Sequence, residues 1–265
     1  MAERVVPGGV LERLAIGDGL TLVQIPSSPF CISVRAALEA GGVPHRVHDT
    51  ALWDRRPVIA LTGGAYYAVP VLVDAGRRPP VVVFEARDEG MDVARYVDDR
   101  YGLGLFPAAL DGLQDLVVQY VEGTVEDVAF RLDDIYLVPR LPDVVERTMI
   151  IRHKERKFGR GCLDQWRAQE RELRARLLDV LAPLERMLAR RPFLLGDRPT
   201  FADYALYGVL GTYTYTGDNA IPEDLPHLTR WYAGLPTVRL DGNAPPGASP
   251  GASPPERPLG ARAGR

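Results

Sequence analysis

The segment that decides the fold is residues 20–42, which read LTLVQIPSSPFCISVRAALEAGG. Residues 20–26 are a short apolar run with β-branched side chains that ends at a proline, a pattern typical of a buried strand. Pro29 then opens a stretch with the apolar spacing of a helix, and two glycines end it. The segment therefore predicts a strand that passes directly into a helix, with two serines at the junction.

This junction is the first place where chemistry is expected. Unpaired backbone N–H groups and the positive end of the helix dipole favour an anion there. Ser28 could donate a hydrogen bond to a bound thiolate, or it could simply be the preferred N-cap residue of the helix. Cys31 lies one turn further on, and it is either a reactive thiol or a core residue on the same face as Val34 and Leu38. The residues alone leave both pairs of alternatives open.

Beyond this segment the strand patterns continue. Three more runs have strand patterns and one has a helical pattern: residues 46–50, 66–73, 81–84 and 88–101. Pro70 interrupts the second of these runs, and a proline inside a strand demands an edge, a strand start or a special turn. A cis Val69–Pro70 bond would turn the backbone of Val69 toward a ligand, although most X-Pro bonds are trans.

The last helix of this half begins with Glu89 and Gly90. Backbone N–H groups at its start could hold a substrate carboxylate, and Glu89 could hold an amino group. The alternative is a first-turn glutamate that the helix dipole favours without any ligand.

The second half of the chain has helical patterns only. They cover residues 111–136, 142–157, 164–190, 201–215 and 225–235. Thr200 and Asp203 have the spacing of a capping box at the start of one of these helices. An α/β half followed by an all-helical half predicts two packed domains, at residues 18–104 and 109–240. Residues 241–265 are rich in Pro, Gly, Ala and Ser and predict a disordered tail, and the first seventeen residues predict a weakly packed leader.

Composition narrows the class of protein. The 265 residues are 46% hydrophobic and 25% charged, with a net charge of −3, which argues against a dedicated nucleic-acid binder. No apolar stretch is long enough to cross a membrane, and the N-terminus lacks the layout of a signal peptide, so we expect a cytoplasmic protein without membrane contact. Two cysteines and four histidines form no metal-binding spacing, so no metal is expected. The basic run at residues 152–160 is either a solvated helix end or the rim of a cleft.

In this order the motifs resemble the glutathione transferase superfamily. SPFCISVR at residues 28–35 is similar to its active-site segment, and Val69–Pro70 is similar to its Val-cis-Pro segment. DEGMDVARYVDDRYG at residues 88–102 resembles the Glu-Ser helix that holds the γ-glutamyl group of glutathione, with Gly90 in place of the serine. GDRPTFADYAL at residues 196–206 resembles the capping box of its second domain. The resemblance spans roughly residues 20–239.

The resemblance implies a thioredoxin-like α/β domain with a mixed four-stranded sheet, followed by an all-α helical bundle. It implies glutathione as co-substrate, bound along Val69, Pro70, Glu89 and Gly90, with Ser28 donating a hydrogen bond to the sulfur. Detoxification is the role of many such enzymes. Many members are dimers, and no residue of this sequence fixes a homodimer interface.

The second substrate implied is a hydrophobic electrophile in a largely apolar cleft between the domains. Residues 117–126 and 206–215 are expected to line that cleft, with Tyr120, Tyr213 and Tyr215 as contacts. Two alternatives remain. One is a glutathione-dependent lyase or reductase that works through Cys31, and the other is a non-catalytic binding module that kept the fold and lost the chemistry.

Overall fold

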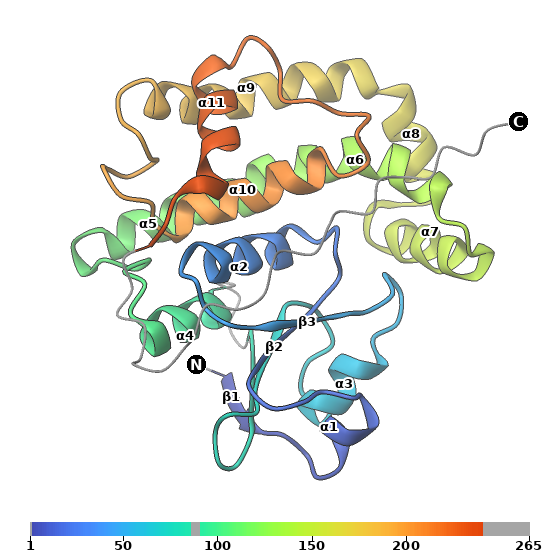
Figure 1. Ribbon diagram of the computed structural model, residues 1–265. Coiled ribbons are helices and arrows are strands. Elements are labelled where there is room, and N and C mark those ends of the chain that lie inside the picture. The colour runs from blue at the N-terminus through green and yellow to red at the C-terminus, as the bar shows by residue number, and fades with distance from the viewer. Residues whose placement is uncertain (1, 86–90, 241–265) are drawn as a thin grey trace, which may run out of the picture.

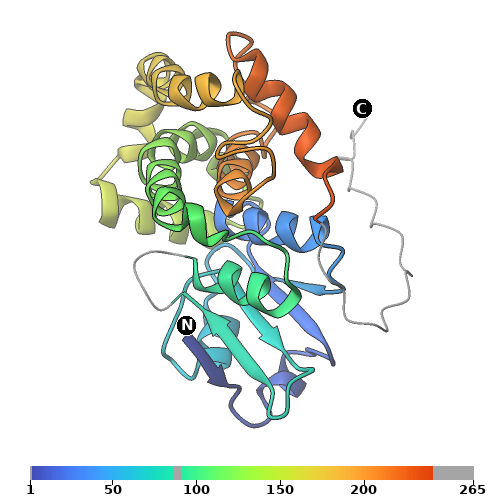
Figure 2. The same cartoon turned by 90° about the vertical axis from the view of Figure 1, so that its left-hand side faces the viewer.

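The computed structural model describes residues 2–85 and 91–240, so the predictions for Glu89, Gly90 and the tail at 241–265 lie outside the described residues. A sheet with short helices forms one half of the molecule, and a layer of longer helices covers it (Figure 1). The side view separates the same two halves, and the first long helix of the chain lies between them (Figure 2). The predicted order, a sheet-containing half and then a helical half, is confirmed.

The sheet is mixed and has five strands. They are β1 (Ala2–Val5), β2 (Leu20–Gln24), β3 (Arg46–Asp49), β4 (Val71–Asp74) and β5 (Val81–Phe84). Their order across the sheet is β1-β5-β4-β2-β3, with β2 and β3 parallel and every other pair antiparallel. Every residue of β2, β4 and β5 is buried. The three inner strands therefore form the rigid base from which the strand-to-helix junction leaves.

The fifth strand corrects the prediction of a weakly packed leader. β1 pairs with β5 along its whole length, with Ala2 opposite Phe84. Val6, Val10 and Ile16 then enter the core next to the short helix α1 (Val10–Arg13). The prediction of a weakly packed leader was wrong because a strand of four residues is too short to show a clear hydrophobic pattern. Its partner β5 also lies about eighty residues further along the chain.

The sheet half carries three further helices, α2 (Pro29–Ala40), α3 (Arg56–Thr62) and α4 (Asp92–Tyr101). α2 begins with a proline in its first turn, as predicted, and buries Cys31, Val34 and Leu38. α3 was not predicted. It has a proline, Pro57, in its first turn and ends where Gly63 takes a positive φ of 61°, a left-handed conformation that favours glycine.

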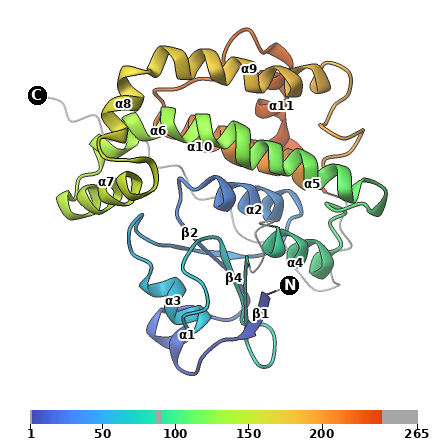
Figure 3. The same ribbon diagram turned by 180° about the vertical axis from the view of Figure 1, so that it is seen from behind.

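The helical half contains the remaining elements. These are η1 (Ala108–Leu110), α5 (Asp111–Gln119), η2 (Tyr120–Val125), α6 (Glu126–Arg140), α7 (Val144–Phe158), α8 (Cys162–Ala168), α9 (Glu170–Leu188), α10 (Phe201–Tyr213), α11 (Pro226–Gly234) and η3 (Leu235–Thr237). α5, the π-helical turn η2 and α6 run on as one long rod, which lies in front of α10 in the view from behind (Figure 3). The helix predicted at residues 164–190 divides at Gln169 into α8 and α9. Within the described residues, no helix is both long and apolar enough to cross a membrane.

The predicted capping box starts α10. The Thr200 side chain bonds the third helical N–H, and the Asp203 side chain accepts a hydrogen bond from the backbone N–H of Thr200 at 2.9 Å. The same carboxylate accepts from the backbone N–H of Leu194 at 2.9 Å and from the indole N–H of Trp231 at 3.2 Å. Since Asp203 is fully buried, this network fixes the start of α10 against the rest of the helical half.

α10 packs directly on α2, and this contact joins the two domains. A Cβ at Gly208 would lie 2.2 Å from the carbonyl oxygen of Pro29, so only glycine fits at this crossing. One turn later, the Thr212 hydroxyl donates to the carbonyl oxygen of Ser27 at 2.8 Å. α10 therefore holds the strand-to-helix junction in place from the side of the helical domain.

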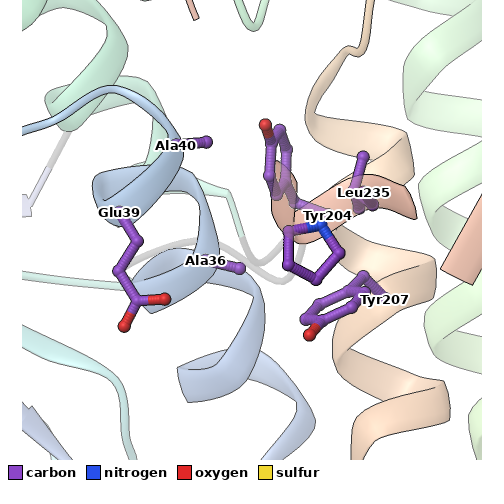
Figure 4. A pocket seen from close by; sticks show the side chains of 7 residues that line it. Ala36, Glu39, Ala40, Tyr204, Tyr207 and Leu235 are labelled. Atoms are coloured by element: carbon purple, nitrogen blue, oxygen red, sulfur yellow. The ribbon is translucent and has the colours of Figure 1, made fainter. Parts of the chain in front are cut away.

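A small cavity also lies between α2 and α10. Ala36 and Ala40 of α2 face Tyr204 and Tyr207 of α10 across it (Figure 4). Its volume of about 30 Å³ is the space that one or two water molecules need. The buried Tyr204 hydroxyl has no hydrogen-bond partner among the described residues. This cavity is the size of a structural water site, and it is too small for a substrate.

Candidate functional site

The larger cavity lies between the domains at the strand-to-helix junction, and its volume is about 260 Å³. This is slightly below the range of about 300–1,000 Å³ that ligand pockets usually have. The sheet domain contributes Ile25, Ser27, Ser28, Pro29, Phe30, Leu52, Arg55, Ala68 and Val69. The helical domain contributes Glu126, Phe130, Asp133, Asp134, Leu137, Ile150, His153, Lys154 and Thr212. Two residues predicted from the sequence, Ser28 and Val69, thus line one cavity.

Ser28 occupies the N-cap position of α2. Its backbone N–H donates to the carbonyl of Ile25 at 2.9 Å, and its own carbonyl accepts from Cys31 at 3.1 Å and Ile32 at 3.0 Å. Its side chain makes no capping hydrogen bond. The half-buried hydroxyl therefore lies at the positive end of the helix and lines the cavity, where it can donate to a ligand.

Cys31 lies behind Ser28 in the core. Its side chain is fully buried, and this burial raises the pKa of its thiol to about 11, although a hydrogen bond with the Ser28 side chain acts in the opposite direction. A thiol with this pKa is protonated at neutral pH, whereas a reactive cysteine needs a thiolate that substrate can reach. The burial favours the interpretation of Cys31 as a core residue.

The Val69–Pro70 bond is cis, as the resemblance implies. Strand β4 begins at Val71, so Pro70 stands directly before the strand. The strand predicted from residue 66 is therefore shorter than expected, because the proline marks its start. Val69 lines the cavity beside Ser28.

The start of α4 is occupied by a carboxylate of the chain itself. The Glu85 side chain accepts from the backbone N–H of Asp92 at 2.6 Å and from that of Val93 at 3.2 Å. Backbone N–H groups at a helix start are the donors that a substrate carboxylate would use. Glu85 takes two of them, whereas Glu89 and Gly90 lie outside the described residues.

The wall formed by α6 and α7 is more polar than the apolar cleft that the sequence predicted. Glu126, Asp133 and Asp134 come from α6, and Lys154 of α7 forms an ion pair with Asp134 at 2.5 Å. Lys154 belongs to the basic run at 152–160, so this run does reach the cleft, but Asp134 neutralises its ammonium group.

Burial shifts the pKa values of the ionisable side chains in this wall. It raises the pKa of Glu126 to about 7, against the opposing charge of Lys154. It raises the pKa of Asp133 to about 8, and the neighbouring charge of Asp134 acts in the same direction. Burial and the charge of Lys154 lower the pKa of His153, so this side chain is neutral at pH 7. Carboxyl groups that titrate near neutral pH in a cleft are typical of functional sites.

The three tyrosines predicted as cleft contacts do not line this cavity. The Tyr120 hydroxyl donates to the carbonyl of Val180 at 2.8 Å, and Tyr213 is buried with its hydroxyl near Arg174. Tyr215 is 47% exposed, beyond the end of α10. The segments 117–126 and 206–215 reach the cavity only through Glu126 and Thr212, because their other faces turn to the core or to solvent.

Sequence reasoning also missed the acidic wall and Arg55. Glu126, Phe130, Asp133 and Leu137 recur at intervals of three or four residues, which places them on one face of α6. A face that mixes carboxylates with large apolar side chains is unusual for a solvated surface. This spacing is the signal in the sequence that indicates the acidic wall.

Both domains match models of a known family. Residues 22–103 match the model described as glutathione S-transferase, N-terminal domain, and residues 160–234 match glutathione S-transferase, C-terminal domain. The two matches occur in the order of the two observed domains and together cover more than half of the chain. The chain belongs to the glutathione S-transferase superfamily. Its fold is the thioredoxin-like domain followed by the helical domain that the family shares, with one strand more than predicted.

Several solved structures have the same fold as this chain at low sequence identity. A glutathione S-transferase of Ceriporiopsis subvermispora in complex with glutathione is 17% identical with a TM-score of 0.70, over 86% of this chain and 100% of that one. Glutaredoxin 2 of Salmonella typhimurium, also in complex with glutathione, is 20% identical with a TM-score of 0.63, over 84% and 97%. A glutathione S-transferase of Rhodospirillum rubrum is 23% identical with a TM-score of 0.58, over 81% and 86%. The search of curated proteins found no match.

The buried Asp133 predicts a pH-dependent stability for this transferase fold. Because its pKa is about 8 in the folded protein and about 4 in an unfolded chain, the folded state holds the proton between these values. The free energy of unfolding therefore falls as pH rises from about 4 to 8. Asp133→Asn removes this fall, so we expect the variant to be more stable than wild type at pH 9, by a few kcal/mol in order of magnitude, and equal to it at pH 4.

Thermal unfolding of both proteins across this pH range checks the prediction. Asp127→Asn is the matched control, because Asp127 lies on the same helix, is 46% exposed and pairs with Arg131 at the surface. Its effect should be small and should not grow with pH. A constant difference between Asp133→Asn and wild type from pH 4 to 9 would contradict the prediction.

Proposed function

We propose that the chain is a glutathione transferase-like enzyme that presents the glutathione thiolate to an electrophile. The observation that carries the proposal is the place of Ser28. Its hydroxyl makes no capping bond, lies at the N-terminus of α2 and lines a cavity that both domains enclose. A hydroxyl donor and a helix N-terminus together stabilise an anion such as a thiolate. Glutathione complexes of two structural neighbours support the choice of ligand.

The proposed mechanism needs few groups from the protein. Val69 and Pro70 would bind the peptide part of glutathione, and Glu89 and Gly90 its glutamyl end. Ser28 would hydrogen-bond the sulfur and lower the pKa of the thiol, whose proton leaves to solvent. The thiolate would then attack an electrophilic carbon of a compound with an apolar body in the cavity. A carbon–sulfur bond forms, and either a leaving group departs with its electron pair or the adduct takes up a proton.

A calorimetric titration of reduced glutathione, followed by a conjugation assay with an aryl halide, tests this proposal. We expect binding at millimolar concentration or below and turnover above the uncatalysed rate. No binding at millimolar glutathione would contradict it. We further propose a cytoplasmic location, where reduced glutathione is available, and a homodimer, which sedimentation would test.

The second candidate is a binding module without catalysis, and one observation favours it. The Glu85 carboxylate occupies backbone donors at the start of α4, where a glutamyl carboxylate would otherwise bind. In that case glutathione fails to bind and the fold serves a partner. The same titration separates the two candidates.

The Cys31-dependent lyase or reductase is the remaining alternative, and the likeness to a glutaredoxin is the observation that keeps it open. Such chemistry needs the thiolate of Cys31, which burial disfavours. We therefore expect Cys31→Ala to keep the conjugation rate within about threefold of wild type, with at most a loss of stability of about 1–2 kcal/mol from the deleted sulfur. A loss of turnover with glutathione affinity unchanged would instead establish Cys31 as the working residue.

A further inference from the structure

The α6 wall of the cavity beside Ser28 carries an excess of negative charge once its carboxyl groups are ionised, above about pH 8. α6 places three carboxylates there, Glu126, Asp133 and Asp134, and Lys154 of α7 compensates only Asp134. His153, the other ionisable group of α7 in the cavity, is neutral at pH 7 because its pKa is lowered. Two carboxyl groups of this wall are therefore without a counter-ion among the described residues.

Arg55 on the opposite wall does not supply that charge. Its strongest electrostatic neighbours are Cys31, Tyr67 and Tyr66 of the sheet domain, and the group of the helical domain on which it acts is His153. The cations that act most strongly on Glu126 are Lys154 and Lys157, and only Lys154 acts comparably on Asp133. The deficit of positive charge is thus a property of the α6 wall itself.

Asp133 is the clearest sign that a ligand belongs there. Its side chain is 1% exposed, it lines the cavity, and its Oδ1 has no hydrogen-bond partner among the described residues. Burying a polar oxygen without a partner costs about 1–3 kcal/mol, and native proteins rarely leave such groups without a ligand, water or function. Glu126, two turns before Asp133 on the same face of α6, is half-buried and forms no ion pair among the described residues.

The same wall already shows how it holds an organic cation. The Lys154 ammonium lies 2.5 Å from Asp134 and 4.5 Å from the centre of the Phe130 ring. A carboxylate together with an aromatic face is a favourable setting for an ammonium or amidinium group. Asp133 and Glu126 flank Phe130 in the sequence of α6 and offer the same combination to a second cation.

We propose that this cavity binds small organic cations, a protonated amine, amidine or guanidine on an apolar body, with Asp133 and Glu126 as the acceptors of its N–H groups. The apolar body would pack against Phe130, Leu137 and Ile150, which line the same space. The bound cation supplies the missing counter-charge. The proposal that such a cation is the second substrate of the enzyme rests on the proposed function. Binding of the cation does not itself require glutathione.

The matched pair benzamidine and benzamide tests this proposal, because the two have nearly the same shape and differ in charge. Each is titrated by calorimetry at pH 9, without glutathione, into wild type, Asp133→Asn and Glu126→Gln. At this pH both carboxyl groups are ionised, and benzamidine, a strong base, keeps its positive charge. We expect wild type to bind benzamidine at least tenfold more tightly than benzamide, and each variant to lose at least tenfold in affinity for benzamidine. Asp127→Asn, whose carboxylate lies outside the cavity and pairs with Arg131, should bind as wild type does.

Three results would overturn the proposal: wild type fails to bind benzamidine, benzamide binds as tightly as benzamidine, or both cavity variants keep wild-type affinity. Circular dichroism and thermal unfolding confirm that the variants fold, and Asp133→Asn is expected to be no less stable than wild type. The outcome is separable from that of the proposed function. Benzamidine binding without glutathione binding would support the cation site and contradict the transferase. Glutathione binding without benzamidine binding would support the transferase and contradict the cation site.

Discussion

Replacing Ser28 by alanine is expected to lower kcat/KM for glutathione conjugation by about 100-fold. This is the usual effect of removing one hydrogen-bond donor that stabilises a negative charge at the reacting atom. The reason lies in the geometry at the start of α2. The Ser28 hydroxyl lines the cavity and makes no capping bond, so its loss removes a hydrogen bond to the thiolate. Glutathione affinity should change little, because that bond is made to the sulfur alone.

Steady-state kinetics at saturating electrophile, with glutathione affinity from calorimetry, separate the two effects. Ser27→Ala is the matched control, because Ser27 lines the same cavity but contributes its backbone carbonyl to the contact with Thr212. That variant should stay within about threefold of wild type. Equal losses in Ser27→Ala and Ser28→Ala would contradict a specific role for Ser28.

Gly208→Ala is expected to cause the largest loss of stability. The new Cβ would lie 2.2 Å from the carbonyl oxygen of Pro29 and 3.1 Å from the Cβ of Ser33. A backbone oxygen cannot move aside alone, so α2 and α10 must separate. Overpacking of this kind costs about 3 kcal/mol or more, which corresponds to a fall in Tm of about 10 °C. Activity should fall too, because Pro29 follows Ser28 directly.

Gly112→Ala provides the control for this variant. Gly112 lies in helix α5, where an added Cβ meets nothing within 4 Å, so alanine should be neutral or stabilise by about 0.5–1 kcal/mol. Thermal unfolding of the two variants side by side measures the difference. Equal Tm values for Gly208→Ala and wild type would show that the domains are not packed through this glycine.

Much of the site could be predicted because its signals are local. The strand, the serine pair and the proline-started helix are adjacent in residues 20–42, and the structure keeps that order. The capping box of Thr200 and Asp203 also depends on neighbouring residues and was predicted from them, whereas the cis Val69–Pro70 bond was implied by the family resemblance.

The misses share a different cause, since each depends on contacts between distant segments. Strand β1 needs β5 as its partner, and nothing within residues 2–5 indicates that pairing. Tyr120 and Tyr213 were assigned to the cleft, but the rotation of each helix is set by the core, which turns both side chains away. The pairing of Lys154 with Asp134 joins α7 to α6 and has no signature in either helix alone.

The most direct test of the central claim is the thiol pKa of glutathione bound to wild type and to Ser28→Ala. Thiolate absorbance is followed against pH. S-methylglutathione, whose methylated sulfur cannot form a thiolate, is the reference, and subtracting its signal removes the absorbance of the protein. We expect a thiol pKa clearly below that of free glutathione in wild type, and a return toward the free value in Ser28→Ala. A bound thiol that titrates like free glutathione, or a lowered pKa that survives in Ser28→Ala, would contradict it.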